Sequence, residues 1–309
     1  MKQFLQTILI VLGLLLAVSI PFDYVFSNHL AHSKARKYVV WNDIIYDSVN
    51  ADLLVLGSSR AWVHYDTHIM DSMLHINSYN LGIDGSAFNR QMLRYNIYSH
   101  YQKHTPKMVL INIDYRSTLG WTFGYEREQF FPYFHIRYAG KEMKGMEPFS
   151  LGELYLPMFR YYKQGVYSTF LGGSYDTTIY KGYEGKVREW DGTKYLEINT
   201  FHFSKNEKTE KAFDLFLEQL KEKKVKVVFV YAPIYIGLTK KVDNLSECHK
   251  TFQYYSDKYQ IPILDYTYYY LSYDTAYFYN ATHLNKTGAE LFTTKLCHDL
   301  DSLGILKQN

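Results

Sequence analysis

The sequence predicts an α/β fold, a three-layer, doubly wound parallel sheet that follows an N-terminal transmembrane helix. Three observations predict it. Short apolar runs recur along the chain, segments with helical spacing of apolar residues separate them, and the amino terminus begins with one long apolar stretch. A strand that is apolar throughout is typical of a parallel sheet, which is covered on both faces. Regular alternation of such strands with helices indicates right-handed βαβ units.

The first expected element is the apolar helix. No charged residue lies between Gln3 and Phe22, and about 20 apolar residues suffice to span a bilayer. The small-residue triplet Ala17-Val18-Ser19 matches a signal-peptide cleavage site, but it lies inside the apolar run rather than after it. We therefore expect an uncleaved membrane anchor over residues 1–26 and a juxtamembrane linker over residues 27–50. Positive charges stand on both sides of the anchor, so charge alone leaves its orientation open.

The strands and helices of the sheet are expected from residue 51 onwards. The run Leu53–Leu56 is apolar, has a polar start and stops at a glycine, as in a buried strand. Further strands are expected at 77–81, 107–113, 225–231 and 261–266, and helices at 66–74, 86–104, 206–224, 245–259 and 287–303.

The alternation is lost between about 118 and 205, where aromatic residues and glycine are frequent. We interpret this segment as an insertion within a domain spanning 51–309. A long loop-rich segment is more often a binding element or a lid than a plain connection. The aromatic rings of 123–138 and 180–192 suit stacking on sugars, but they suit the packing of a lid or a partner interface equally well.

Composition excludes some classes of function. The net charge is +3 and no basic run is present, so no nucleic-acid partner is expected. No cysteine or histidine cluster has the spacing of metal ligands, so we expect no metal and no cofactor. The two cysteines, Cys248 and Cys297, could form a disulfide or remain buried thiols, and the sequence leaves this open.

A glycine–serine turn, Gly57-Ser58-Ser59, follows the first strand. Reactive groups of open α/β sheets gather at the carboxyl ends of strands, although the turn by itself is better explained as a helix cap. A serine nucleophile needs a neighbouring base, and His283, just before the last helix, is expected at the same edge of the sheet. The remaining histidines near the first helices are expected at the surface or at helix ends: His64, His68, His100 and His104.

With these residues the chain resembles the SGNH hydrolase superfamily. Within that superfamily it is similar to a branch of membrane-tethered bacterial envelope proteins, those of polysaccharide O-acetylation and teichoic acid D-alanylation. The resemblance rests on residues 57–59 (GSS), 80–85 (NLGIDG) and 280–283 (NATH). It implies a flavodoxin-like fold, with Ser59 as nucleophile, His283 as general base and Gly85 in the oxyanion hole. It also implies an extracytoplasmic domain, periplasmic or at the cell surface.

The chain departs from the family pattern at two points. Asn280 stands where the family has an aspartate, and an amide can orient an imidazole but cannot offset its positive charge. The family's Gly-x-Asn block is missing near 112–116, which leaves its oxyanion donor unassigned. The backbone N–H groups of Ser59 and Gly85 could form a two-donor hole without it.

The leading functional hypothesis is therefore a membrane-anchored serine esterase or acyltransferase. The resemblance implies that it acts on acyl groups, most simply acetyl, of a cell-envelope carbohydrate. The alternative is a non-catalytic glycan-binding or assembly subunit that has kept the fold while the site decays. Asn280 and the missing block favour this alternative, whereas the retained serine, glycine and histidine oppose it.

Overall fold

The computed structural model describes residues 1–115, 120, 124–162, 178–192 and 200–304. The chain divides into two compact units. The first joins Met1–Asp43 with Phe123–Thr177, and the second joins Ile44–Thr122 with Thr178–Asn309.

The first unit contains the long helix α1 and an aromatic core. Within the described residues, α1 (Lys2–Leu30) is the one helix long and apolar enough to cross a membrane. In the core, Trp41 donates to Gln129 Oε1 at 2.9 Å, and the Tyr133 hydroxyl contacts Asn42 Oδ1 at 2.6 Å. The other elements are α2 (Arg36–Tyr46), η1 (Arg127–Tyr133), α6 (Arg137–Met146), α7 (Leu151–Tyr155) and η2 (Phe159–Tyr161).

Part of the aromatic segment forms this core. Phe130, Phe131 and Tyr133 are fully buried, and Phe134 is nearly so. These rings therefore pack the core of the first unit and are not available for stacking on sugars. The expected loss of regular structure is only partial, because α6 and α7 lie within the same segment.

The second unit is built on a five-stranded parallel sheet with the order β2-β1-β3-β6-β7. The first strand in the chain is β1. The next strand, β2, lies on one side of it, and β3, β6 and β7 follow on the other side, so the strand order reverses beside β1. Ligands of doubly wound sheets bind at such a point, at the carboxyl ends of the strands. The strands are β1 (Leu53–Leu56), β2 (Ser78–Asn80), β3 (Met108–Asn112), β6 (Lys226–Tyr231) and β7 (Ile263–Asp265).

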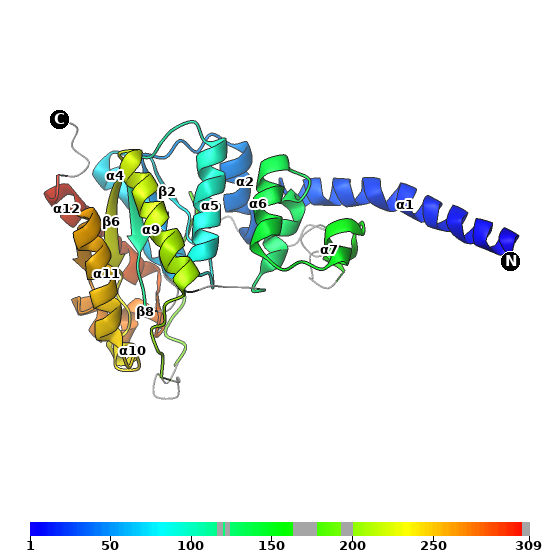
Figure 1. The fold of residues 1–309 in the computed structure, drawn as a ribbon. Helices are drawn as coiled ribbons and strands as arrows, with labels where there is room; N and C mark the ends of the chain where they lie inside the picture. Colours follow the sequence, from blue (N-terminus) through cyan, green and yellow to red (C-terminus); the bar gives the residue numbers. More distant parts are fainter. Residues whose placement is uncertain (116–119, 121–123, 163–177, 193–199, 305–309) are drawn as a thin grey trace. The chain divides into compact units, whose positions relative to one another are not determined.

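Helices cover both faces of the sheet, which confirms the three-layer prediction. On one face, Phe229 of β6 packs between Phe213 and Phe252, with ring centroids 6.0 and 6.1 Å away. This face carries α5 (Phe88–Tyr101), α9 (Glu207–Glu222) and α11 (Leu245–Tyr259), of which α9 and α11 lie in front of β6 in Figure 1. The other face carries α3 (Ser59–His64), α4 (Thr67–Leu74) and α12 (Lys286–Ser302).

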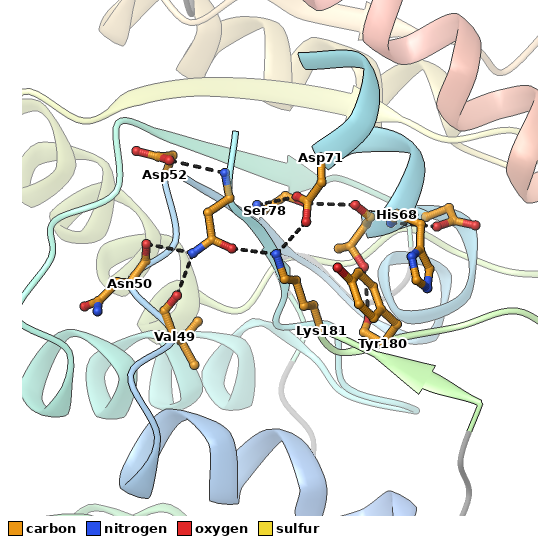
Figure 2. A network of polar contacts seen from close by, with 11 residues as sticks. Val49, Asn50, Asp52, His68, Asp71, Ser78, Tyr180 and Lys181 are labelled. Carbon is orange, nitrogen blue, oxygen red and sulfur yellow. Dashed lines mark hydrogen bonds and ion pairs between the residues drawn. The ribbon is translucent and has the colours of Figure 1, made fainter. Parts of the chain in front are cut away.

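A small hairpin covers the edge strand β2. It consists of β4 (Ile179–Tyr180) and β5 (Tyr183–Glu184), and the backbone N–H of Asn80 donates to Lys181 O at 2.8 Å. Figure 2 shows the Lys181 ammonium beside Asp71. Its Nζ lies 2.5 Å from Asp71 Oδ2 and 2.7 Å from Asn77 Oδ1. An uncovered edge strand can pair with strands of other chains. By covering β2, this hairpin protects the sheet from such pairing.

The remaining elements of the second unit lie between β6 and α12. They are α10 (Ile236–Thr239), η4 (Tyr270–Tyr273), η5 (Thr275–Tyr277), β8 (Phe278–Asn280) and β9 (His283–Leu284).

Candidate active site

Ser59 lies at the carboxyl end of β1, as the first residue of α3. The turn before it requires glycine, because a Cβ atom on Gly57 would lie 2.6 Å from Ala61 Cβ and 2.9 Å from Asn112 Cβ. Gly57 also has a φ of +155°, which side chains rarely tolerate. At the start of a helix the Ser59 N–H has no intrahelical acceptor, so it remains available to a bound group.

His283 comes from the hairpin of β8 and β9, and its Nε2 atom lies 2.7 Å from Ser59 Oγ. Its Nδ1 atom lies 2.9 Å from Asn280 Oδ1. That oxygen also accepts from the backbone N–H groups of Thr282 and His283, each at 3.0 Å. Thr282 Oγ1 lies 2.8 Å from Nδ1 and donates its proton to the same Asn280 oxygen. Both oxygens facing Nδ1 are thus acceptors, so Nδ1 carries the proton and Nε2 accepts from the serine hydroxyl. The imidazole is in the tautomer that a serine nucleophile requires.

The pKa of His283 lies far below its ordinary value. Burial is the main cause, and the positive charges of Arg60 and Lys186 add to it, which lowers the pKa to about 3. The ring is therefore neutral at pH 7 and able to accept a proton. The same environment disfavours the imidazolium that forms when the proton arrives, because no anion among the described residues contacts the ring.

A buried ion pair lies beside the nucleophile and separates the roles of the two serines. Arg60 Nη2 lies 3.0 Å from Asp114 Oδ2, and both side chains are almost fully buried. The Ser58 hydroxyl donates to the same oxygen at 3.2 Å. Ser58 is therefore engaged with the ion pair, and Ser59 is the serine that faces the histidine.

The loop that carries Gly85 is fastened beside the serine turn. Asn80 Nδ2 donates to Ala61 O at 2.7 Å, and the Ile83 N–H donates to Gly57 O at 3.1 Å. Gly85 itself is exposed and has a φ of +59°. The structure thus brings together the segments of Ser59, His283 with Asn280, and Gly85, which are far apart in the sequence.

Asn112 lies in the region 112–116, where the family's Gly-x-Asn block is missing. It ends β3 and is fully buried, and its Oδ1 accepts from the Tyr65 hydroxyl at 2.8 Å. Its Nδ2 has no hydrogen-bond partner among the described residues. A buried donor without an acceptor is costly, and this one lies against the Gly57 turn. Arg116, the last residue of the region 112–116, lies outside the described residues.

His64 ends α3, as one of the two expected positions, but it does not lie at the surface. The residue is fully buried, its Nε2 accepts from the Leu284 N–H at 3.0 Å, and its ring centroid is 6.2 Å from that of His283. Burial, followed by the charges of His283 and Arg60, holds its pKa well below the ordinary value. Apolar spacing could not reveal this, because α3 has only six residues. His68 and His100 are exposed, as expected.

Two neighbours of His283 carried no signal in the sequence. Tyr279 stacks on the imidazole, with centroids 5.3 Å apart and planes 4° apart. Lys186 follows the β4–β5 hairpin, pairs with Glu184 and lies 4.5 Å above the Trp62 ring. The Tyr279–His283 contact lies within the β8–β9 hairpin, which has no apolar pattern of its own. The Lys186–Trp62 contact joins segments that are distant in sequence, so spacing could not predict it.

The two cysteines were also candidates for site chemistry. Cys248 and Cys297 are separate buried thiols, and burial raises the pKa of each to about 12, so they are poor nucleophiles. Within the described part of the chain, no three His, Cys, Asp or Glu side chains are grouped to hold a metal ion.

Comparison with known proteins gives structural matches only. No protein-family model matches the chain. No curated protein matches it either. One solved structure that it resembles is a proposed acylhydrolase from Bacteroides fragilis, with 13% identity, a TM-score of 0.38, and coverage of 80% of this chain and 86% of that one. Another is a GDSL-like lipase from Bacteroides thetaiotaomicron, with 12% identity, a TM-score of 0.40, and coverage of 89% of this chain and 99% of the lipase.

Proposed function

We propose that this chain is a serine esterase or acyltransferase whose nucleophile is Ser59. The observation that carries the proposal is the continuous hydrogen-bonded series from Ser59 Oγ through His283 to Asn280 Oδ1. Such a series, with the base oriented by a third group, is the arrangement that activates a serine hydroxyl.

In the proposed reaction, Ser59 Oγ attacks the carbonyl carbon of an ester while His283 Nε2 takes the hydroxyl proton. The backbone N–H groups of Ser59 and Gly85 would donate to the oxyanion that forms. His283 then returns the proton to the leaving alkoxide, which departs as an alcohol and leaves an acyl-serine. Water or a sugar hydroxyl completes the cycle by accepting the acyl group, and this choice separates hydrolysis from transfer.

The proposed setting is the cell envelope. The apolar helix α1 would anchor the chain with its catalytic domain outside the cytoplasm. The sequence resemblance favours acyl groups, most simply acetyl, on an envelope carbohydrate as substrate.

A second candidate is a non-catalytic glycan-binding or assembly subunit. The observation that favours it is the electrostatics of His283, whose pKa is lowered by burial and by Arg60 and Lys186, while the groups at Nδ1 are the uncharged side chains of Asn280 and Thr282. The serine–histidine contact would then be a remnant of an ancestral enzyme.

A fluorophosphonate probe separates the two candidates. Full-length protein in detergent micelles should be labelled at Ser59, and Ser59→Ala should abolish both labelling and the hydrolysis of small acetyl esters. Ser58→Ala is the matched control, because it removes a hydroxyl one residue away that contacts Asp114 instead of His283. It should keep most of the activity. Equal loss in both variants, or labelling at another residue, would remove Ser59 from its proposed role.

A further inference from the structure

The polarity of α7 is inverted, and η2 continues the same outer surface. The buried residue of α7 is Glu153, 7% exposed, and η2 buries Arg160, 8% exposed, together with Tyr161. The large apolar side chains point outward instead, and the exposed fractions are 76% for Leu151, 75% for Tyr155, 52% for Leu156 and 39% for Phe159. We call these four residues the α7 surface. A soluble segment buries apolar side chains and exposes charged ones, so this surface is suited to an apolar environment.

Fixed contacts hold the α7 surface in this orientation. Ser150 and Glu153 form a capping box at the start of α7, and Arg127 pairs with the Glu153 carboxylate. A Cβ on Gly152 would lie 2.7 Å from the Phe159 ring, so Phe159 packs directly against α7. The outward direction of the apolar side chains is therefore built into the fold.

The α7 surface lies next to one level of α1. The Asp23 carboxylate accepts from the Met158 N–H at 2.8 Å and pairs with Arg160. One turn further along α1, Ser27 and Phe26 contact Tyr161, through a 2.8 Å hydrogen bond and rings 4.8 Å apart. Figure 1 shows α7 alongside this part of α1.

That level corresponds to the edge of a bilayer. The uncharged stretch from Gln3 to Phe22 extends about 30 Å as a helix at ~1.5 Å per residue, which matches the hydrocarbon thickness. Asp23 is the first charged residue after it, so the segments bound to Asp23 stand at the headgroup region. Tyrosine is enriched at that depth.

We propose that the α7 surface enters the bilayer interface, so that the first unit contacts lipid through α7 and η2 as well as through α1. This inference rests on the membrane anchor of the proposed function. Apolar side chains placed between headgroups and acyl chains are stabilised by leaving water. We assign the α7 surface to lipid because it lies next to the apolar helix α1 at the depth where that helix leaves the hydrocarbon.

The test uses full-length protein in lipid vesicles with an environment-sensitive fluorophore on a single introduced cysteine. Leu156→Cys reports on the α7 surface. Leu215→Cys on α9 is the matched control, since Leu215 is 59% exposed but belongs to the second unit. Leu12→Cys, within α1, reports on the anchor. Nitroxide quenchers are attached to lipid acyl chains at a shallow or a deep position.

We expect the shallow quencher to quench the Leu156 probe several-fold more strongly than the Leu215 probe, and the deep quencher to quench the Leu12 probe. If the Leu12 probe is quenched but the Leu156 probe behaves like the Leu215 probe, the interfacial contact is overturned while the anchor stands, and the surface is left for a protein partner. If the Leu12 probe is not quenched, the anchor fails, and the inference fails with it.

Discussion

His283 Nδ1 contacts the side-chain amide of Asn280. A serine triad has a carboxylate at this position. Asn280 Oδ1 reproduces the geometry, since it accepts from Nδ1, from two backbone N–H groups and from the Thr282 hydroxyl. It supplies no negative charge, while Arg60 and Lys186 both oppose protonation of the ring. The site is thus positioned for the first proton transfer but stabilises the resulting imidazolium poorly.

Asn280→Asp should therefore raise esterase turnover. An aspartate is nearly isosteric and keeps every acceptor role of Asn280, while its charge favours the imidazolium and raises the pKa of His283. The reverse change in a serine protease lowers turnover by ~10⁴, so a gain of roughly tenfold, about 1.4 kcal/mol of barrier, is a modest expectation. Steady-state kinetics against pH measure it, and the acidic limb of the profile should move to higher pH.

Asn280→Ala is the control for this prediction, because it removes both charge and orientation and should lower turnover. If Asn280→Asp leaves the rate unchanged or lowers it in a folded protein, the missing carboxylate is not what limits the site. The chemistry then differs from simple ester hydrolysis.

Elements with a strong apolar pattern were predictable, and those held by distant contacts were not. The strand Leu53–Leu56 and the helix Leu245–Tyr259 have the expected bounds, because apolar runs and apolar spacing are local signals. The β4–β5 hairpin was not foreseen, since its strands have two residues each and depend on Lys181 bridging to α4 and the start of β2.

In the candidate site, the serine turn and the histidine were visible as motifs. The Arg60–Asp114 pair and Lys186 carried no local pattern.

The hairpin gives a prediction at this scale, from the network in Figure 2. Asp71 accepts from the Ser78 N–H and hydroxyl, each at 2.6 Å, as well as from Lys181. Asp71→Ala leaves these donors without their acceptor and should cost about 2–3 kcal/mol of unfolding free energy. Lys181→Ala removes a partly exposed ion pair and one hydrogen bond to Asn77, and it should cost about 1 kcal/mol or less. Urea denaturation of the full chain in detergent measures both, and an equal cost would contradict the assigned role of Asp71.

For the whole molecule, the two neighbouring histidines link stability to pH. His283 has its pKa lowered to about 3, and burial holds the pKa of His64 well below 6.5. In the unfolded chain both titrate near 6.5. Below that pH the unfolded state binds protons that the folded state does not, so protonation stabilises the unfolded state. The folded state keeps its full stability above about pH 6.5 and loses it progressively as the pH falls towards 3.

The loss should appear before the carboxylates contribute. Asp52, Asp214 and Asp299 have pKa values below 3.8, which their lysine partners lower against the opposing effect of burial, so their effect begins only near pH 4 and below. Between pH 6 and 4.5 each histidine should therefore remove up to about 1.4 kcal/mol of unfolding free energy per pH unit. Denaturation of the full chain in detergent across this range measures the slope. His64→Gln, whose side-chain oxygen can still accept from the Leu284 N–H, and His283→Gln should each reduce it. A slope that neither variant changes would show that these rings bind protons as readily in the folded protein as in the unfolded chain, so that neither pKa is lowered by burial.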